Sequence, residues 1–378
     1  MLHKRVTAET RSNSETKIWH WRNSTLLKAE KRMLNNLQLL RAFAALNVVL
    51  LHAIGTSASY SYEANFISVF GEWGANGVDI FFVISGFVML FTQLDNKRSV
   101  KDFLLLRAIR IIPIYWLLTL LVIAIYIVAP FVFREMVIST KWALASLGFL
   151  SNVLVEKHPI VYVGWTLEWE MLFYLVFGLS LWFRSWTTAL FTTCVVLLGV
   201  AFIAANFIFV EFIAGLCIAL LYKRYGYNRY GMFSLVLGTI LLSLSLFDSV
   251  KLLIDSRVIL WGLPSILIVY GVICSPQIES KIGKLLGDAS YSIYLIQMLS
   301  IPVYYKFLSV LNIKMNNDLL VIACLIATAI GGVALYLLVE KPMISFLKKY
   351  FFRNVIANWF FSNEWMVRQS KEATQQLP

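Results

Sequence analysis

Charged residues are scarce in this chain, since Asp, Glu, Lys and Arg make up only 14% of its 378 residues. Soluble globular proteins average about 25% charged residues. Hydrophobic residues make up 59% of the chain, and its mean hydropathy is +0.73. This shortage of charge argues against a soluble domain and predicts an all-α, polytopic transmembrane helical bundle.

Cysteine is also scarce, and several common motifs are missing. The four cysteines lie in hydrophobic stretches without a CxxC pair or any other metal-binding spacing, so we expect small core residues and no metal site. The sequence has no Gly-rich phosphate loop and no GxSxG nucleophile elbow. Residues 1–36 have no apolar run of the kind found in a cleavable signal peptide, so we expect the first hydrophobic stretch to direct insertion.

Ten hydrophobic stretches are each close to the ~20 residues that a helix needs to cross a bilayer. An eleventh apolar patch, at 142–155, is too short to cross, and we expect a short interfacial or re-entrant helix there. The predicted plan is a basic N-terminal segment (1–36), a transmembrane domain (37–345) and a C-terminal tail (346–378). The ten stretches cover residues 37–57, 77–94, 108–133, 164–184, 187–206, 207–222, 231–248, 257–274, 286–307 and 319–339.

The formal net charge of +12 would favour a nucleic-acid partner in a soluble protein, but its distribution argues otherwise. With the N-terminus inside, the inner segments hold 24 of the 33 Lys and Arg residues and the outer segments hold 7. Short cytoplasmic loops carry such an excess of positive charge. We therefore predict a multi-pass protein of the inner (plasma) membrane with both termini in the cytoplasm, in contact with membrane lipid and not with nucleic acid.

Arg41 and His52 lie inside the first hydrophobic stretch, eleven residues apart. Eleven positions complete about three helical turns, so both side chains project from one face about 16 Å apart along the axis. Ionisable residues within a membrane span normally face a bundle interior or a water-filled cavity. One helix face therefore carries a fixed cation and a titratable base, and we expect chemistry there. The other three histidines lie in polar segments, where we expect them to be solvated.

Glu170 and Tyr174, in the fourth stretch, are i and i+4 neighbours on one helix face. This stretch is expected to run from outside inward, which puts Glu170 in the outer half, where His52 also lies. We predict that the two meet, because a carboxylate on an imidazole raises its basicity and fixes its tautomer. A buried pair that only ties two helices together is the alternative. Glu168 points about 200° away from Glu170, nearer the interface.

Arg107 and Arg110 share one face at the inner end of the third stretch. Two guanidinium forks there suit phosphate or pyrophosphate, although membrane anchoring alone would also place arginine at this boundary. In the second stretch, Asp79 lies near the outer end, and Ser85 with Gly86 offers a small surface for a helix or a ligand. For Asp79 and Ser85, structural and functional readings both stay open.

The ninth stretch carries a polar stripe formed by Ser290, Tyr294 and Gln297, at i, i+4 and i+7. The stripe would line the same cavity or make hydrogen bonds between helices. Trp165 fits an aromatic belt at the outer interface as well as a platform for sugar stacking. Residues 340–342 (EKP) predict an ion pair and a helix stop.

Together these motifs resemble the acyltransferase 3 family of integral membrane O-acyltransferases, especially its exopolysaccharide-modifying members. The match covers most of residues 34–345, and the motifs come in the family's order. They are Arg41-x10-His52, residues 77–86 (GVDIFFVISG), Arg107-x-x-Arg110, residues 165–174 (WTLEWEMLFY), residues 290–295 (SYSIYL) and residues 340–342.

The resemblance implies transfer of an acyl group, usually acetyl, from cytoplasmic acyl-CoA to a hydroxyl of an extracytoplasmic glycan such as exopolysaccharide or O-antigen. His52 would act as the base or carry the acyl group, with help from Glu170 and Tyr174. Acyl-CoA would be the co-substrate, with no permanently bound cofactor. The expected acyl-CoA contacts are Arg41, Ser85, Arg107 and Arg110, and the expected acceptor contacts are Asp79, Trp165, Tyr291, Tyr294 and Gln297.

One residue departs from the family's pattern, because family members commonly have His where this chain has Gln297. Glutamine donates and accepts hydrogen bonds but does not shuttle protons, which leaves His52 as the one base within the predicted spans. A proton-coupled transporter or a flippase of glycan precursors is the competing function, since it would use the same His, Glu and Arg. The acceptor, the acyl chain length and any oligomer or polysaccharide-assembly partner stay open.

Overall fold

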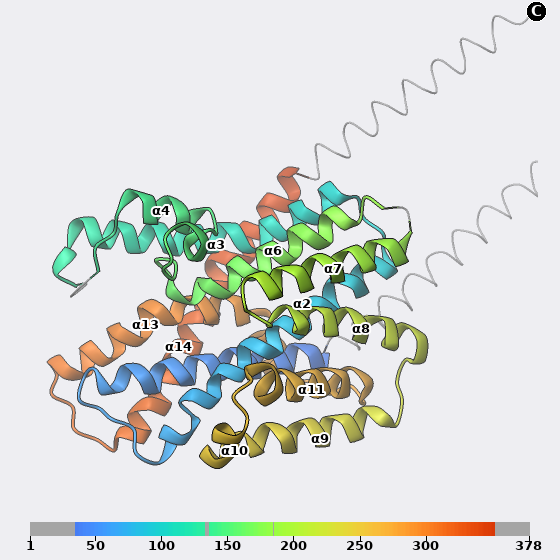
Figure 1. Cartoon of the computed structure of the whole chain (residues 1–378). Coiled ribbons are helices and arrows are strands. Elements are labelled where there is room, and N and C mark those ends of the chain that lie inside the picture. Colours follow the sequence, from blue (N-terminus) through green and yellow to red (C-terminus); the bar gives the residue numbers. More distant parts are fainter. Residues whose placement is uncertain (1–34, 133–135, 184, 352–378) are drawn as a thin grey trace, which may run out of the picture. The chain divides into compact units, whose positions relative to one another are not determined.

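In the computed structural model, the described residues are 35–132, 136–183 and 185–351, and every regular element among them is helical (Figure 1). All ten predicted spans coincide with helices, which confirms a polytopic membrane bundle. The first is Asn35–Ala58. The others are α2 (Asn76–Asp95), α3 (Val100–Val128), α6 (Trp165–Ser180), α7 (Trp186–Ile203), α8 (Phe209–Tyr225), α9 (Tyr230–Leu244), α11 (Leu263–Cys274), α13 (Ser290–Val310) and α14 (Asn317–Leu335).

Within the described residues, six helical segments are long and apolar enough to cross a membrane. They are Asn35–Ala58, Phe66–Asp95, Val100–Val128, Trp186–Ile203, Ser290–Val310 and Asn317–Phe351. The apolar patch at 142–155 forms two short helices, α4 (Thr140–Leu147) and α5 (Ser151–Leu154). The remaining short elements are η1 (Phe66–Phe70), η2 (Glu72–Ala75), η3 (Pro130–Val132), η4 (Tyr162–Gly164), α10 (Asp248–Leu253), η5 (Val258–Gly262), α12 (Lys281–Asp288) and η6 (Tyr336–Glu340).

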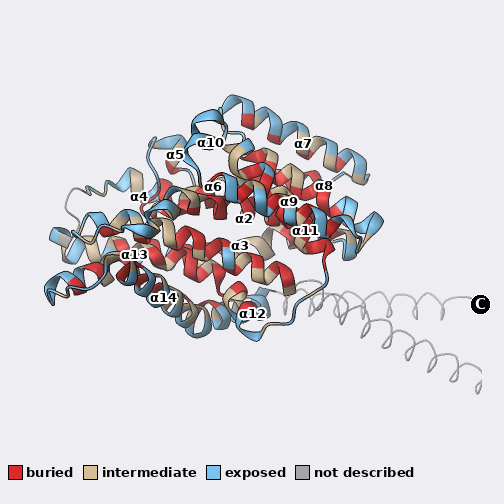
Figure 2. Ribbon diagram, turned by 90° about the horizontal axis from the view of Figure 1, so that it is seen from below, coloured by how far each residue is buried: buried red, intermediate tan, exposed pale blue. Residues whose placement is uncertain are grey.

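The helices differ strongly in how much of their surface is covered. In the most apolar window of Phe66–Asp95, 72% of the residues are buried, against 22% in Trp186–Ile203 (Figure 2). An apolar helix that stays exposed in the folded chain fits a lipid-facing position. α2 is therefore a central helix among the segments that it packs against, and α7 is a peripheral helix.

The chain folds into two compact units. Of the described residues, the first unit contains 35–95, 200–290 and 315–322, and the second contains 96–132, 136–183, 185–199, 291–314 and 323–351. In the first unit α2 lies against α8, and α9 lies against α11. In the second unit α3 contacts α6 and α4.

Two glycines bring α2 and α8 into backbone contact. A Cβ atom on Gly86 would lie 2.1 Å from the carbonyl oxygen of Phe212, and one on Gly215 would lie 2.2 Å from the carbonyl oxygen of Val83. Only glycine fits such an approach, as at the small-residue contacts of membrane helices. The glycine of the Ser85-Gly86 step therefore serves helix packing.

The helix stop expected at residues 340–342 is wrong. The helix continues through Pro342 to Phe351 by way of the π-helical turn η6, in which the Lys341 backbone N–H bonds to the Tyr336 carbonyl. Such a wide turn accommodates a proline without ending the helix. Glu340 is buried and accepts a 2.6 Å hydrogen bond from the Ser292 hydroxyl, so it ties this turn to α13.

Candidate active site

The inner arginine pair lies on α3, in the second unit. Arg107 and Arg110 are one turn apart and half-buried. The Arg107 guanidinium carbon is 5.7 Å from the ring centre of Phe103 and 5.9 Å from that of Tyr174. Its Nε atom is buried without a hydrogen-bond partner among the described residues. Aromatic rings stabilise a guanidinium by cation–π contact but leave its N–H groups available to an anion.

Further cations gather around this pair. Arg98 and Arg110 both interact electrostatically with Arg107, and Lys348 interacts electrostatically with all three arginines. Glu170 and Tyr174 also interact electrostatically with Arg107. Like charges this close repel each other, so the cluster formed by Arg98, Arg107, Arg110 and Lys348 favours a ligand with several negative charges.

Glu170 and Tyr174 meet on α6 as their spacing predicts. The Tyr174 hydroxyl donates a hydrogen bond to Glu170 Oε1, one turn earlier on the helix. Tyr174 is buried, whereas Glu170 stays half-buried. Tyr174 therefore contacts two charged groups: its hydroxyl bonds to the Glu170 carboxylate, and its ring lies near the Arg107 guanidinium.

Glu168 has different hydrogen-bond partners from Glu170. Its carboxylate accepts hydrogen bonds from the backbone N–H groups of Ser151 (2.8 Å) and Asn152 (3.0 Å), and from the Asn152 side chain (2.8 Å). Three donors at the first turn of α5 hold that short helix against α6. The side chain is 6% exposed, so Glu168 is a buried residue that ties α5 to α6.

Of the stripe predicted on α13, Tyr294 makes hydrogen bonds to other elements of the second unit, as does its neighbour Tyr291, whereas the Ser290 hydroxyl has no partner among the described residues. The Tyr291 hydroxyl donates to the Ile111 carbonyl at 2.7 Å, and Tyr294 donates to the Val163 carbonyl at 2.9 Å. Tyr294 also shares a 2.8 Å hydrogen bond with Thr166, next to the half-buried Trp165 that begins α6. These contacts are the interhelical hydrogen bonds that the sequence left open, and the acceptor-binding roles of Trp165, Tyr291 and Tyr294 stay predictions.

Gln297 is fully buried on the same helix. Its Nε2 atom donates to the Tyr294 carbonyl at 2.7 Å, and its Oε1 atom has no partner among the described residues. One oxygen is therefore left to accept a hydrogen bond from a bound molecule.

Arg41 and His52 belong to the first helix, in the first unit, and both are half-buried. Arg41 Nη1 lies 3.5 Å from Gln38 Oε1, and Gln38 in turn donates to Asp288 at 2.9 Å. Glu170 belongs to the second unit, so the predicted meeting of His52 and Glu170 stays a prediction. Ser85 is half-buried on α2, and its role toward acyl-CoA also stays a prediction.

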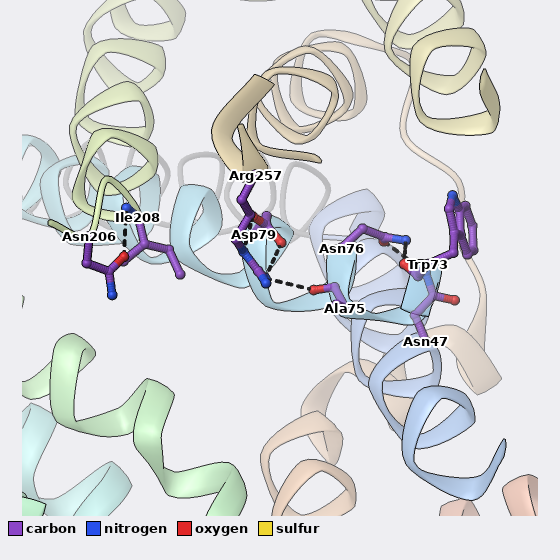
Figure 3. Close-up of polar contacts among 8 residues, drawn as sticks. All are labelled: Asn47, Trp73, Ala75, Asn76, Asp79, Asn206, Ile208 and Arg257. Carbon is purple, nitrogen blue, oxygen red and sulfur yellow. Dashed lines mark hydrogen bonds and ion pairs between the residues drawn. The ribbon is translucent and has the colours of Figure 1, made fainter. Parts of the chain in front are cut away.

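Asp79 has a partner that the sequence did not reveal. Arg257 donates to both of its carboxylate oxygens, from Nη2 at 2.7 Å and from Nε at 3.2 Å, and its Nη2 also reaches the Ala75 carbonyl (Figure 3). Asp79 is fully buried. Nearby, Asn47 of the first helix donates to Asn76 at 3.1 Å, which links that helix to the start of α2 (Figure 3).

Four charged residues near these sites were missed from the sequence: Arg98, Glu211, Arg257 and Lys348. Glu211 gave a usable signal, since it is a single carboxylate in the first turn of an otherwise apolar helix. Arg257 gave none, because it is the first residue of the predicted span 257–274, and a charged residue at the end of a span is ordinary. No group of three or more His, Cys, Asp or Glu within the described residues is arranged to hold a metal ion.

Comparisons with known proteins identify the family of the chain. Residues 34–337 match the model of an acyltransferase domain family. The exopolysaccharide production protein ExoZ of Rhizobium meliloti (strain 1021) is 32% identical over 294 residues, which cover 72% of this chain and 90% of ExoZ. No solved structure matches. The family match extends over most of the chain and over every predicted site residue, so the protein belongs to the acyltransferase 3 family and is a membrane acyltransferase.

Proposed function

We propose that this protein transfers an acyl group, in the first instance acetyl, from cytoplasmic acyl-CoA to a hydroxyl group of an extracytoplasmic glycan. The observation that carries the proposal is the cationic cluster of Arg98, Arg107, Arg110 and Lys348. Coenzyme A presents a pyrophosphate and a further phosphate, which are the groups that paired guanidinium forks bind best. The buried, unpartnered Nε of Arg107 supplies a donor for one of them.

The excess of Lys and Arg in the proposed inner segments supports the same direction of transfer. Arg98 and Arg107 of the cluster belong to the basic segment 95–107, which the charge distribution assigns to the cytoplasm and in which α3 begins. A donor that arrives from the cytoplasm would meet this end of α3 first.

His52 is the proposed base. The bond changes balance when the acceptor hydroxyl loses its proton to the imidazole, its oxygen forms the new ester C–O bond, and the thioester C–S bond breaks to release coenzyme A, which takes up a proton. An acyl group carried on His52 would divide the same change into two steps. In either case a histidine without its proton is required, and general-base help is typically worth 10²–10⁴-fold in rate.

The acceptor is proposed from the ExoZ match. That relative is named for exopolysaccharide production, so an exopolysaccharide or its lipid-linked precursor is the first acceptor to test. The half-buried Trp165 and the free Oε1 of Gln297 offer stacking and hydrogen bonding to a sugar.

The test uses the full-length protein in lipid nanodiscs with acetyl-CoA labelled in the acetyl group and purified exopolysaccharide. We expect thioester loss and label transfer in the wild type, and neither above background in His52→Ala. Propionyl-CoA and a lipid-linked oligosaccharide probe the donor and the acceptor in parallel reactions. Folded protein that turns over no acyl-CoA with any of these acceptors would contradict the proposal.

A further inference from the structure

The first unit contains a buried carboxyl pair that the proposed catalytic residues do not use. Asp79 on α2 and Glu211 on α8 are both fully buried, and their carboxyl groups lie close enough together to interact electrostatically. Neither oxygen of Glu211 has a donor among the side chains and backbone groups of the described residues. Two ionised carboxylates repel each other and only accept hydrogen bonds, so a proton on one of them removes the repulsion and lets that group donate to the other.

The surroundings are shaped to keep this proton. Arg257 holds the Asp79 carboxylate by two hydrogen bonds and stacks 5.0 Å from the ring centre of Trp261. One guanidinium neutralises one carboxylate, so a single shared proton leaves the three groups without net charge. An uncompensated charge is strongly unfavourable in such a buried place, which favours the shared proton.

The backbone near Glu211 is also adapted to the carboxyl group. Arg257 precedes the π-helical turn η5, and a Cβ atom on Gly262, the last residue of η5, would lie 2.8 Å from Glu211 Oε1. A glycine therefore makes room for the carboxyl group. Single π-helical turns occur frequently at functional sites.

Along the first helix, Asp79 lies nearer the level of Arg41 than that of His52. The Cβ position of Gly77 lies 2.2 Å from the Ala44 carbonyl oxygen, and that of Gly74 lies 2.3 Å from the Asn47 carbonyl oxygen and 2.9 Å from Leu51. The first helix and the start of α2 therefore run antiparallel. His52 follows Leu51, whereas Asp79 lies beyond Gly77 toward Arg41.

We propose that Asp79 and Glu211 share one proton and form a relay site that takes up and releases the proton moved during acyl transfer. The role as a relay rests on the proposed function. In that reaction the proton leaves the acceptor hydroxyl on one side of the membrane and is needed by the coenzyme A sulfur on the other. The pair gains and loses this one proton in each cycle, so no further reactant is consumed.

The shared proton is tested without any acyl-CoA, by infrared difference spectroscopy of the full-length protein in nanodiscs. We expect a carbonyl band of a protonated carboxyl group that shifts in D2O and disappears in Glu211→Gln. Asp79→Asn provides a second variant in case Glu211→Gln does not fold. Glu168→Gln is the matched control, since that carboxylate is held by three N–H donors, and its loss should leave the band in place. Absence of the band in the folded wild type would overturn the proposal.

The relay role is tested by acyl transfer with the same variants. We expect Glu211→Gln to slow transfer at least about tenfold at an unchanged KM for acetyl-CoA, because general acid–base help is typically worth 10²–10⁴-fold. The solvent isotope effect should change in the same variant, which a merely structural residue would not cause. Transfer at the wild-type rate would overturn the relay. A wild type that shows the band but transfers no acyl group would instead contradict the proposed function.

Discussion

The guanidinium of Arg107 on α3 lies 5.9 Å from the ring centre of Tyr174 on α6. This contact joins the arginine pair, proposed to bind coenzyme A, to the span that carries Glu170. The same guanidinium lies 5.7 Å from the ring centre of Phe103, so two aromatic rings limit the positions open to its N–H groups. Donor binding and the Glu170–Tyr174 pair should therefore be coupled.

Replacement of Arg107 by lysine should weaken donor binding. Lysine keeps the charge but loses the planar fork, and a charge-assisted hydrogen bond is worth about 1.5–3 kcal/mol. We expect the KM for acetyl-CoA to rise roughly tenfold to a hundredfold with a smaller change in kcat. With a thioester of dephospho-coenzyme A as the donor, Arg107→Lys should raise the KM by a smaller factor if Arg107 contacts the phosphate that this donor lacks.

Arg224 offers a matched control for this replacement. Its guanidinium lies 5.4 Å from the ring centre of Tyr225, but it is exposed and belongs to the first unit. Arg224→Lys should leave the KM for acetyl-CoA unchanged. An equal rise in both variants would show that general surface charge, and not the cluster, attracts the donor.

His52→Ala should give a folded protein with at least about a hundredfold lower transfer rate, because it removes the proposed base. The control is His158→Ala, which changes an exposed histidine before α6 and should keep full activity. The measurement is label transfer from acetyl-CoA under single-turnover conditions, with thermal unfolding as the check of folding. Retained transfer in His52→Ala would assign the base to another residue.

The helices were predictable from the sequence, whereas several partners of the buried charges were not. Runs of apolar residues mark all ten spans because the bilayer demands length and hydrophobicity within one continuous segment. The Tyr174–Glu170 hydrogen bond was equally visible, since i,i+4 neighbours meet on any helix. The Asp79–Arg257 ion pair joins residues 178 positions apart and depends on how α2 packs against distant segments, which hydropathy does not encode.

Glu168 and Glu170 of α6 also show which contacts the sequence does not reveal. Their spacing predicted that the two side chains point in different directions. The sequence did not reveal that Glu168 accepts hydrogen bonds from N–H groups of α5. That contact depends on a loop between α4 and α6. The π-helical turn before Pro342 was likewise missed, since a proline inside a helix normally marks a stop or a kink.

Glu168 and Glu170 should respond in opposite ways to mutation. Glu168→Ala leaves the N–H groups of the buried Ser151 and the half-buried Asn152 unpaired, and an unpaired buried group costs about 1–3 kcal/mol, so the melting temperature should fall. Glu170→Gln keeps the shape of a half-buried side chain and should leave the melting temperature within a few degrees while slowing transfer. Thermal unfolding and transfer rates, measured on the same preparations, would separate the two. Loss of stability in both variants would show that Glu170 is structural.

Gly86→Ala should disrupt the contact between α2 and α8. Its new methyl group would lie 2.1 Å from a backbone oxygen, so the helices must separate, and overpacking of this kind typically costs about 1–3 kcal/mol. Gly199→Ala on α7 is the control, because nothing lies within 4 Å of its Cβ position. Alanine is favoured over glycine in a helix interior by about 1 kcal/mol, so this second variant should be neutral or slightly stabilising. Equal effects on thermal unfolding would contradict the close approach of the two helices.

The direction of transfer depends on topology, and two exposed lysines test it. Lys97, between α2 and α3, belongs to the predicted inner side, and Lys314, between α13 and α14, belongs to the outer side. In a variant without native cysteines, Lys314→Cys should react with a membrane-impermeant maleimide in intact cells. Lys97→Cys should react only after the membrane is opened, because the excess of Lys and Arg holds its loop in the cytoplasm. The reverse pattern would place the arginine cluster outside the cell, where no acyl-CoA reaches it, and would exclude a cytoplasmic donor.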